Sequence, residues 1–206
     1  MIDLLWPATL ETLYMVSVAS VVAVLGGIPL GVLLARAPKP VYRPVSLVGN
    51  AARSLPFIVL LLLLTPFTRT VTGTGIGPEA AIVPLSIGAI PFFARLVENS
   101  LREVDPGLIE AGRSLGMRSW TLVTKVLLPE ALPSLVRGIT VTIVALIGYS
   151  AMAGVVGGGG LGTLAIVWGH ERFRTDVLLA TAAVLIVLVQ GIQSGGDHLA
   201  KRLDRR

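Results

Sequence analysis

A run of glycines, Gly157–Thr163 (GGGGLGT), has the residue types that could bind a phosphate group. Glycines leave backbone N–H groups open to a ligand, and the run satisfies the spacing G-x-G-x-x-G. A P-loop also needs a lysine after its last glycine, and here Thr163 follows directly. A dinucleotide fingerprint should follow a strand in a soluble domain, whereas this run ends an apolar stretch of membrane-span length. The sequence therefore predicts a flexible, close-packed turn and no nucleotide site.

Two further kinds of chemistry are excluded by the neighbours of the residues that could perform them. Ser150 misses the nucleophile-elbow pattern because Met152 stands where the second glycine is needed, and no histidine is placed to activate the serine. His170 and His198 lack neighbouring metal ligands, and the chain has no cysteine. We expect neither catalytic residues nor a metal site.

The composition places the chain in a membrane. Of its 206 residues 53% are hydrophobic, and the mean hydropathy of +0.82 is too high for a water-soluble domain of this size. The N-terminal residues lack the basic region of a cleavable signal peptide, so the first apolar stretch is predicted to be a retained span. We expect an all-α integral membrane protein with a single transmembrane domain over residues 1–206.

Five apolar segments are predicted to cross the bilayer, since about 20 apolar residues span its hydrocarbon core. With their flanks they are residues 13–35, 52–70, 79–97, 137–160 and 176–196. The second is the weakest, because its uncharged run Leu55–Phe67 has 13 residues and needs its flanks or a thinned bilayer. GxxxG spacings predict close helix packing in two spans; they join Gly27 to Gly31, Gly154 to Gly158, and Gly158 to Gly162.

Basic residues predict the orientation of these spans, because cytoplasmic loops carry an excess of lysine and arginine. With five spans, 14 of the 17 basic residues fall on one side, and Arg69, Arg172 and Arg174 fall on the other. This places the N-terminus outside and the C-terminus inside, and it removes the case for nucleic acid as a partner. No charged residue lies well inside a span, so we expect energy to come from outside the spans rather than from a proton or sodium relay.

The most charged segment, about residues 100–135, is predicted to be two short amphipathic helices joined at a bend; we call it the knob. Asp105 can cap the first helix, Pro106 suits its first turn, and Gly116 fits the left-handed position that ends it. Ser119 is expected to cap a second helix that ends near Leu128, where Pro129 interrupts it.

On that second helix, periodicity predicts one apolar side and one side for solvent or a partner. The apolar side carries Trp120, Val123 and Leu127, with Leu122 and Val126 beside them. Arg118, Thr121 and Lys125 lie on the other side. By periodicity alone, an ordinary amphipathic connector would fit equally well.

The spacing within the knob resembles the EAA loop of ABC importer permeases, EAA-x3-G-x9-I-x-LP. The matching positions are Glu110, Ala111, Gly112, Gly116, Val126, Leu128 and Pro129. Gly112 replaces the second alanine and Val126 replaces isoleucine, and both changes are small. The resemblance implies that the knob is a coupling element that docks on a cytoplasmic ATPase subunit. ATP and Mg would then be bound by that partner, with no cofactor on this chain.

Further stretches resemble one subfamily, the permeases of methionine importers. They are ETLYMVSVAS from Glu11, RSLPFIVLLLLLTPFTR from Arg53, IPFFARLVENSLREVDPG from Ile90, IGYSAMAGVVGGGGLG from Ile147 and FRTDV from Phe173. The resemblance implies a type I importer fold in the bacterial cytoplasmic (inner) membrane. It also implies a homodimer around a central pathway for L- or D-methionine, with two ATPase subunits and an extracytoplasmic substrate-binding protein.

Tyr149, Ser150 and Met152 are the candidates for lining the pathway, Met152 because a thioether side chain can deform around a moving solute. Ordinary helix packing is an equal alternative for Met152. Two other functions stay open. One is an importer of a different small solute, since specificity largely resides in the binding protein. The other is a passive channel or membrane scaffold, which would need no coupling loop.

Overall fold

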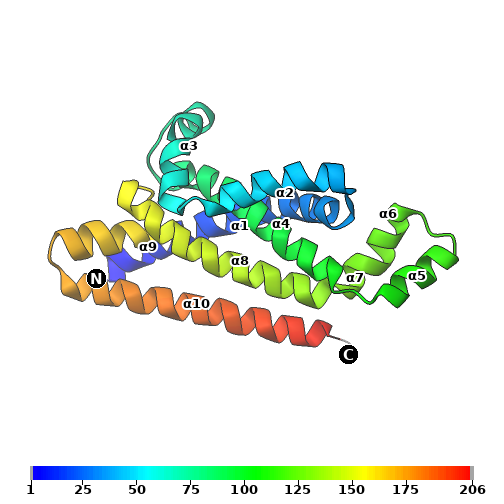
Figure 1. Cartoon of the computed structure of the whole chain (residues 1–206). Helices are drawn as coiled ribbons and strands as arrows, with labels where there is room; N and C mark the ends of the chain where they lie inside the picture. Colours follow the sequence, from blue (N-terminus) through cyan, green and yellow to red (C-terminus); the bar gives the residue numbers. More distant parts are fainter. Residues whose placement is uncertain (1, 205–206) are drawn as a thin grey trace.

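A computed structural model describes residues 2–204, which form helices and turns and contain no strand. The long helices α1 (Ile2–Arg36), α4 (Pro78–Arg102), α8 (Leu132–Ala153) and α10 (Thr175–Leu203) run alongside one another (Figure 1). A bilayer offers no partners for backbone N–H and C=O groups, so apolar segments of this length fold as helices. By length and composition four helices could cross a membrane, or five if α2 and α3 form one bent span.

Helices α1 and α4 form the centre of the bundle, and two glycines of α1 allow them to approach closely. A Cβ atom on Gly31 would lie 2.5 Å from Val97 Cβ, and one on Gly27 would lie 2.7 Å from Phe93 Cδ1. The close packing predicted for this GxxxG pair is therefore confirmed.

The second predicted segment, residues 52–70, straddles a sharp bend and is not one helix. Helix α2 (Lys39–Ser54) and helix α3 (Phe57–Thr72) meet at an angle of 106°. Leu55 is extended (ψ 132°), as expected for a residue before a proline, and Pro56 starts the new direction. Helix α3 leaves the side of the bundle (Figure 1) and exposes Leu62, Leu63 and Phe67.

The predicted fourth span ends before residue 160, because its glycines form a hairpin instead of continuing the helix. A 3₁₀ turn, Gly154–Val156, follows α8, and the chain re-enters as α9 (Gly160–Thr163) with a π-helical segment, Leu164–Glu171, that the sequence analysis missed. Gly154, Gly158 and Gly162 therefore do not lie on one continuous helix, although the close packing predicted for them is present. A Cβ on Gly154 would overlap the backbone of Gly162 and Thr163, so these glycines allow the two arms of the hairpin to touch.

The predicted close-packed turn at Gly157–Thr163 is confirmed, and α1 and α4 hold it in place. Gly157, Gly159 and Gly160 have positive φ angles, which glycine adopts without strain. The N–H of Gly160 donates to Glu11 Oε2 at 2.7 Å, and the N–H of Leu161 donates to Thr12 Oγ1 at 2.8 Å. The N–H of Gly77, which precedes α4, donates to the carbonyl of Gly157 at 2.9 Å.

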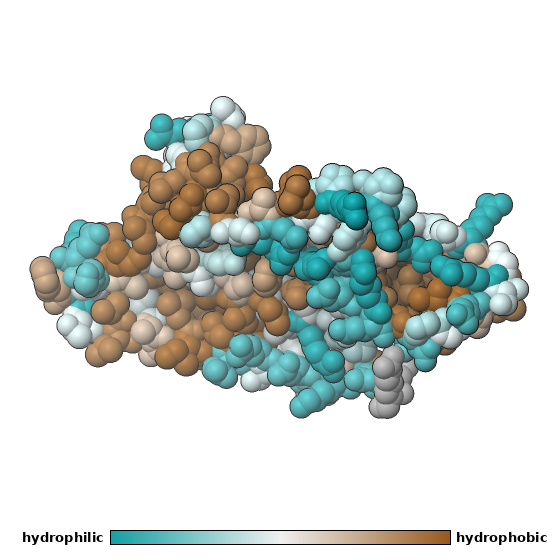
Figure 2. Space-filling model, viewed as in Figure 1, coloured by the Kyte–Doolittle hydropathy of each residue, from teal (hydrophilic) through white to brown (hydrophobic). Residues whose placement is uncertain are grey.

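Apolar contacts divide the bundle into three clusters along its length. One joins α1, α3, α4 and α8 around Met15, Leu85 and Leu146. A second joins α4 to the knob, and a third joins the start of α1 to α9 and α10 around Leu161 and Val177. Figure 2 shows hydrophobic side chains over α3 and the end of the molecule near the hairpin, and hydrophilic ones toward the knob.

Candidate functional site

The knob projects from the end of the bundle opposite the glycine hairpin (Figure 1), and its first helix is α5 (Pro106–Ser114). Asp105 stands at its N-cap, where Oδ1 accepts the N–H of Gly107 at 2.7 Å. Pro106 occupies the first turn, where its missing N–H costs nothing. Both predictions about the start of this helix are confirmed.

The bend after α5 is built on Gly116, whose φ of 74° confirms the predicted left-handed end. Its N–H donates to the carbonyl of Arg113 at 2.9 Å, and the N–H of Met117 donates to the carbonyl of Gly112 at 3.1 Å. This pair of bonds satisfies carbonyls that a helix end otherwise leaves unpaired. The bend is therefore a fixed angle rather than a loose loop.

The second helix of the knob differs from the prediction at both ends. It begins as α6 (Ser119–Leu122) with Arg118 at the cap position and no side-chain capping bond, so the capping role of Ser119 is wrong. A π-helical segment, Val123–Leu127, and α7 (Leu128–Glu130) then lead toward α8. Pro129 does not stop the helix, because the wider π turn accommodates a residue that has no N–H to donate.

The buried face of the knob joins it firmly to α4. Val123 and Leu127 are buried in one cluster with Leu101, in the last turn of α4, and Val104, which follows that helix. Leu122 is also buried, and a Cβ on Gly112 would lie 2.6 Å from its Cδ1 atom. This contact explains why glycine stands where the EAA pattern has its second alanine.

The outer face of the knob combines apolar and charged side chains. Trp120 is 73% exposed, so its predicted place on the buried side is wrong, and Leu115 is 77% exposed. Glu110, Arg113 and Arg118 are exposed as well, as are Thr121 and Lys125. Large apolar side chains among charges at a protruding tip are typical of a surface that docks on a protein partner.

The three predicted pathway residues lie near the end of α8 in different surroundings. Met152 is 42% exposed. The ring of Tyr149 stacks on that of Phe57 from α3, with 4.7 Å between ring centroids. Ser150 is only 2% exposed, and its hydroxyl donates to the carbonyl of Ile147 at 2.8 Å. The geometry therefore brings Met152 to a surface and fixes Tyr149 against α3, while Ser150 faces the interior.

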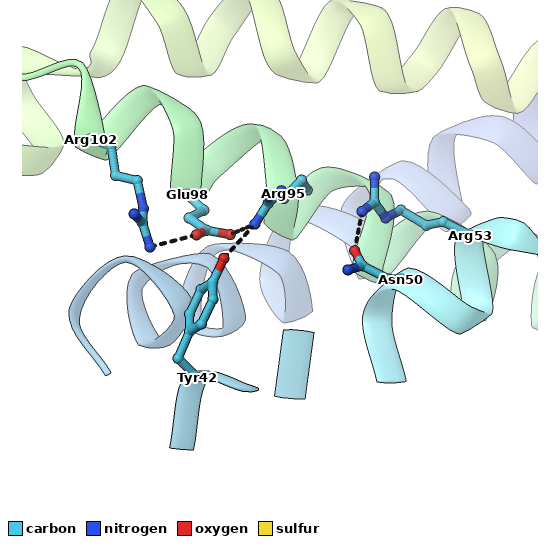
Figure 3. Close-up of polar contacts among 6 residues, drawn as sticks. All are labelled: Tyr42, Asn50, Arg53, Arg95, Glu98 and Arg102. Carbon is cyan, nitrogen blue, oxygen red and sulfur yellow. Dashed lines mark hydrogen bonds and ion pairs between the residues drawn. The ribbon is translucent and has the colours of Figure 1, made fainter. Parts of the chain in front are cut away.

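A buried ionic cluster near the knob was missed by the sequence analysis. Glu98 of α4 is 1% exposed and binds both Arg95 and Arg102 of the same helix (Figure 3). The third predicted span ends at residue 97, so Glu98 and Arg102 were placed outside it. The spacing 95, 98, 102 places all three on one helical face, which is the signal that could have revealed the cluster.

Comparisons with known proteins agree with this geometry. Residues 27–206 match the family of binding-protein-dependent transport system inner membrane components. The chain is 51% identical to the probable D-methionine transport system permease protein MetI of Vibrio cholerae, over 99% of this chain and 94% of that protein. It is 44% identical to the methionine import system permease protein MetP of Bacillus subtilis, over 98% and 94%.

The fold is likewise that of solved transporters. A chain of the MetNI methionine ABC transporter, solved in inward-facing conformations, superimposes with a TM-score of 0.97 at 45% identity and covers 100% of this chain and 98% of its own. A chain of an amino acid ABC transporter with histidines matches with a TM-score of 0.83 at 22% identity, over 97% and 94%, which supports the fold alone. The chain belongs to the family of binding-protein-dependent transport system inner membrane components.

Proposed function

We propose that this chain is the permease subunit of an ATP-driven methionine importer that works by alternating access. The knob carries the proposal, because a rigid, protruding element with exposed Leu115 and Trp120 has no use in a passive channel. Identities of 44–51% over nearly the whole chain to methionine permeases support methionine as the substrate. An importer of another small solute would have the same architecture. The two alternatives differ in which solute the vesicles accumulate.

The packing of the knob suggests how force reaches the spans. Val123 and Leu127 are buried against the end of α4, and α7 leads toward the start of α8. A displacement of the knob is therefore passed to two spans at once instead of being absorbed in a loop. Glu110, Ala111, Gly112, Gly116, Leu128 and Pro129 are the residues we assign to coupling with a cytoplasmic ATPase subunit.

A second copy of the chain would complete the pathway. Helix α3 leaves the bundle with Leu62, Leu63 and Phe67 exposed, and Met152 is exposed near it on α8. We propose that the partner copy covers this side, that Met152 lines the route between the copies and that Tyr149 positions it through its stack on Phe57. Two ATPase subunits would hold ATP and Mg, and an extracytoplasmic binding protein would deliver methionine.

The orientation follows from the positions of the termini and the charges. Helix α1 begins and α10 ends at opposite ends of the bundle (Figure 1), as an odd number of spans requires. The knob and the end of α10 lie at the basic end, which the positive-inside rule places in the cytoplasm. We therefore propose an N-terminus outside and a C-terminus inside.

Uptake in vesicles tests the proposal. The chain is reconstituted with its ATPase and binding protein, and labelled methionine is offered outside with ATP inside. We expect accumulation that requires hydrolysable ATP. An excess of roughly tenfold of unrelated amino acids outside the vesicles should not reduce this accumulation. Accumulation of methionine without ATP would contradict the importer mechanism. ATP-dependent accumulation of a different solute instead of methionine would contradict methionine as the substrate.

A further inference from the structure

We infer that Glu98 is a positioning residue that fastens α2 to α4, so that the bent segment α2–α3 moves together with the knob. This inference rests on the proposed function, because it concerns how a displacement of the knob reaches α3. The coupling residues lie on α5, on α7 and, for Gly116, in the bend after α5, so a connection from them to α2 would run through α4. The geometry around Glu98 supplies one.

Both carboxylate oxygens of Glu98 are occupied. Oε2 accepts from Arg95 Nη1 at 2.6 Å, and Oε1 accepts from Arg102 Nη2 at 2.9 Å. A carboxylate with 1% exposure needs such partners, since an unpaired buried charge is strongly unfavourable. The result is that two long, flexible arginine side chains are held in fixed positions on one face of α4.

The two arginines meet the same residue of α2, Tyr42 (Figure 3). Arg95 Nη1 donates to the hydroxyl of Tyr42 at 3.0 Å. The guanidinium carbon of Arg102 lies 5.4 Å from the centroid of the Tyr42 ring, within the range of a cation–π contact. Glu98 does not touch α2 itself and acts on Tyr42 through the arginines.

Helix α2 lies on the surface of the bundle, where Val45, Ser46 and Gly49 pack half-buried near α1 and α4. None of its described residues, 39–54, is buried, and Val41, Leu47 and Val48 are exposed. At its C-terminal end the chain turns at Pro56 into α3. The contact of Tyr42 with the two arginines adds a directional, polar connection to this shallow packing, and we infer that it keeps α2 from sliding along α4.

The other side of the connection leads to the knob. Leu101 lies three residues after Glu98 on the same helix, and it packs with Val104 against Val123 and Leu127 of the knob. Helix α4 therefore connects the knob directly to the Glu98 cluster. With the cluster intact, a displacement of the knob is passed through α4 to α2, and across the bend to α3.

A disulfide between α2 and α4 can take the place of the proposed contact and can be reduced again. The chain has no cysteine of its own, so an introduced pair would supply its only thiols. A Cβ built on Gly49 of α2 would lie 3.9 Å from Pro91 Cβ of α4, which suits a disulfide. In the reconstituted importer carrying Gly49→Cys and Pro91→Cys, we expect oxidation to leave ATP-driven uptake unchanged, because α2 and α4 do not part. If oxidation stops uptake, α2 slides along α4 and the inference is wrong.

The same pair provides a rescue. Glu98→Gln keeps the shape but replaces one acceptor oxygen with a donor, so one arginine loses its partner. We expect methionine taken up per ATP hydrolysed to fall about fivefold, as the loss of one such bond shifts a two-state equilibrium by that factor. Oxidation of the cysteine pair should restore the ratio and a reductant should lower it again. A ratio that stays low after complete oxidation would overturn the inference.

Two further variants separate fastening from a general loss of structure or charge. Tyr42→Phe keeps the ring and loses the hydroxyl, and should give a smaller loss that oxidation also repairs. Arg53→Gln also changes the charge near α2 by one unit, in the opposite sense, but Arg53 donates to Asn50 Oδ1 on its own helix at 2.6 Å, so uptake should not change. An equal loss in Arg53→Gln would show that any disturbance of α2 lowers uptake, whether or not the Tyr42 contact is intact, and would contradict the inference.

The rate of disulfide formation tests the fastening without any transport. In detergent and without nucleotide, we expect the cysteine pair to oxidise measurably more slowly when Glu98 is glutamine, because α2 spends more time away from α4. Equal rates would refute the fastening even if uptake changed. An unmodified chain that imports no methionine would refute the proposed function, while the oxidation rates would still decide the role of Glu98.

Discussion

Replacement of Gly116 by valine is expected to lower ATP-driven methionine uptake about tenfold while the partner ATPase still hydrolyses ATP. Gly116 has a φ of 74°, which costs a residue with a Cβ about 1–2 kcal/mol, enough to reduce the population of the bent knob by about that factor. A Cβ at Gly116 would meet nothing within 4 Å, so the cost is conformational rather than steric. The measurement is uptake per ATP hydrolysed in reconstituted vesicles.

Asparagine at the same position provides the control. It adopts the left-handed conformation more readily than other residues with a Cβ, so Gly116→Asn should retain most of the uptake. Glu110→Gln should also weaken coupling, because Glu110 is exposed on the surface that we assign to the ATPase. Full uptake by both the Gly116→Val and the Glu110→Gln variants would contradict the coupling role that we assign to the knob.

Replacement of Gly154 by alanine is expected to have the largest effect on folding. The added Cβ would overlap the backbone of Gly162 and Thr163, and no side-chain rotation can relieve a clash with backbone. Overpacking of this kind costs about 1–3 kcal/mol or more, and here it also opens the turn that Glu11 and Thr12 hold. We expect little protein in the membrane and a lower melting temperature in detergent.

Gly148, six residues earlier on α8, is the matched control. A Cβ there would meet nothing within 4 Å in the same chain, so Gly148→Ala should accumulate and melt like the parent protein. If the Gly154→Ala variant proved as abundant and as stable as the Gly148→Ala variant, the close contact between the two arms of the hairpin would be contradicted.

The features predicted well from the sequence depend on neighbouring residues alone. Asp105 caps α5 and Gly116 ends it because caps and left-handed positions are determined within a few residues. The GxxxG pair in α1 succeeded because that helix continues through both glycines. The same spacing at Gly154, Gly158 and Gly162 was less informative, since it cannot distinguish glycines that lie on one helix face from glycines that fold a hairpin.

The features that were missed depend on changes of helical period or on contacts far apart in the sequence. A uniform α-helix from Ser119 to Leu128 places Trp120 with Val123, whereas the π-helical segment after Leu122 turns the later residues, and Leu122, Val123 and Leu127 share the buried side. The cluster around Glu98 was missed because it is completed by Tyr42, which lies 53 positions before Arg95 in the sequence.

Labelling of the knob tests the central claim most directly. Leu115 is 77% exposed at the tip of the knob, and Leu115→Cys would introduce a single thiol there in a chain without cysteine. In membrane vesicles of known orientation, we predict that an impermeant maleimide reacts from the cytoplasmic side alone, and that bound ATPase protects the thiol. Reaction from the outer side, or equal labelling with and without the ATPase, would contradict force transmission through this knob.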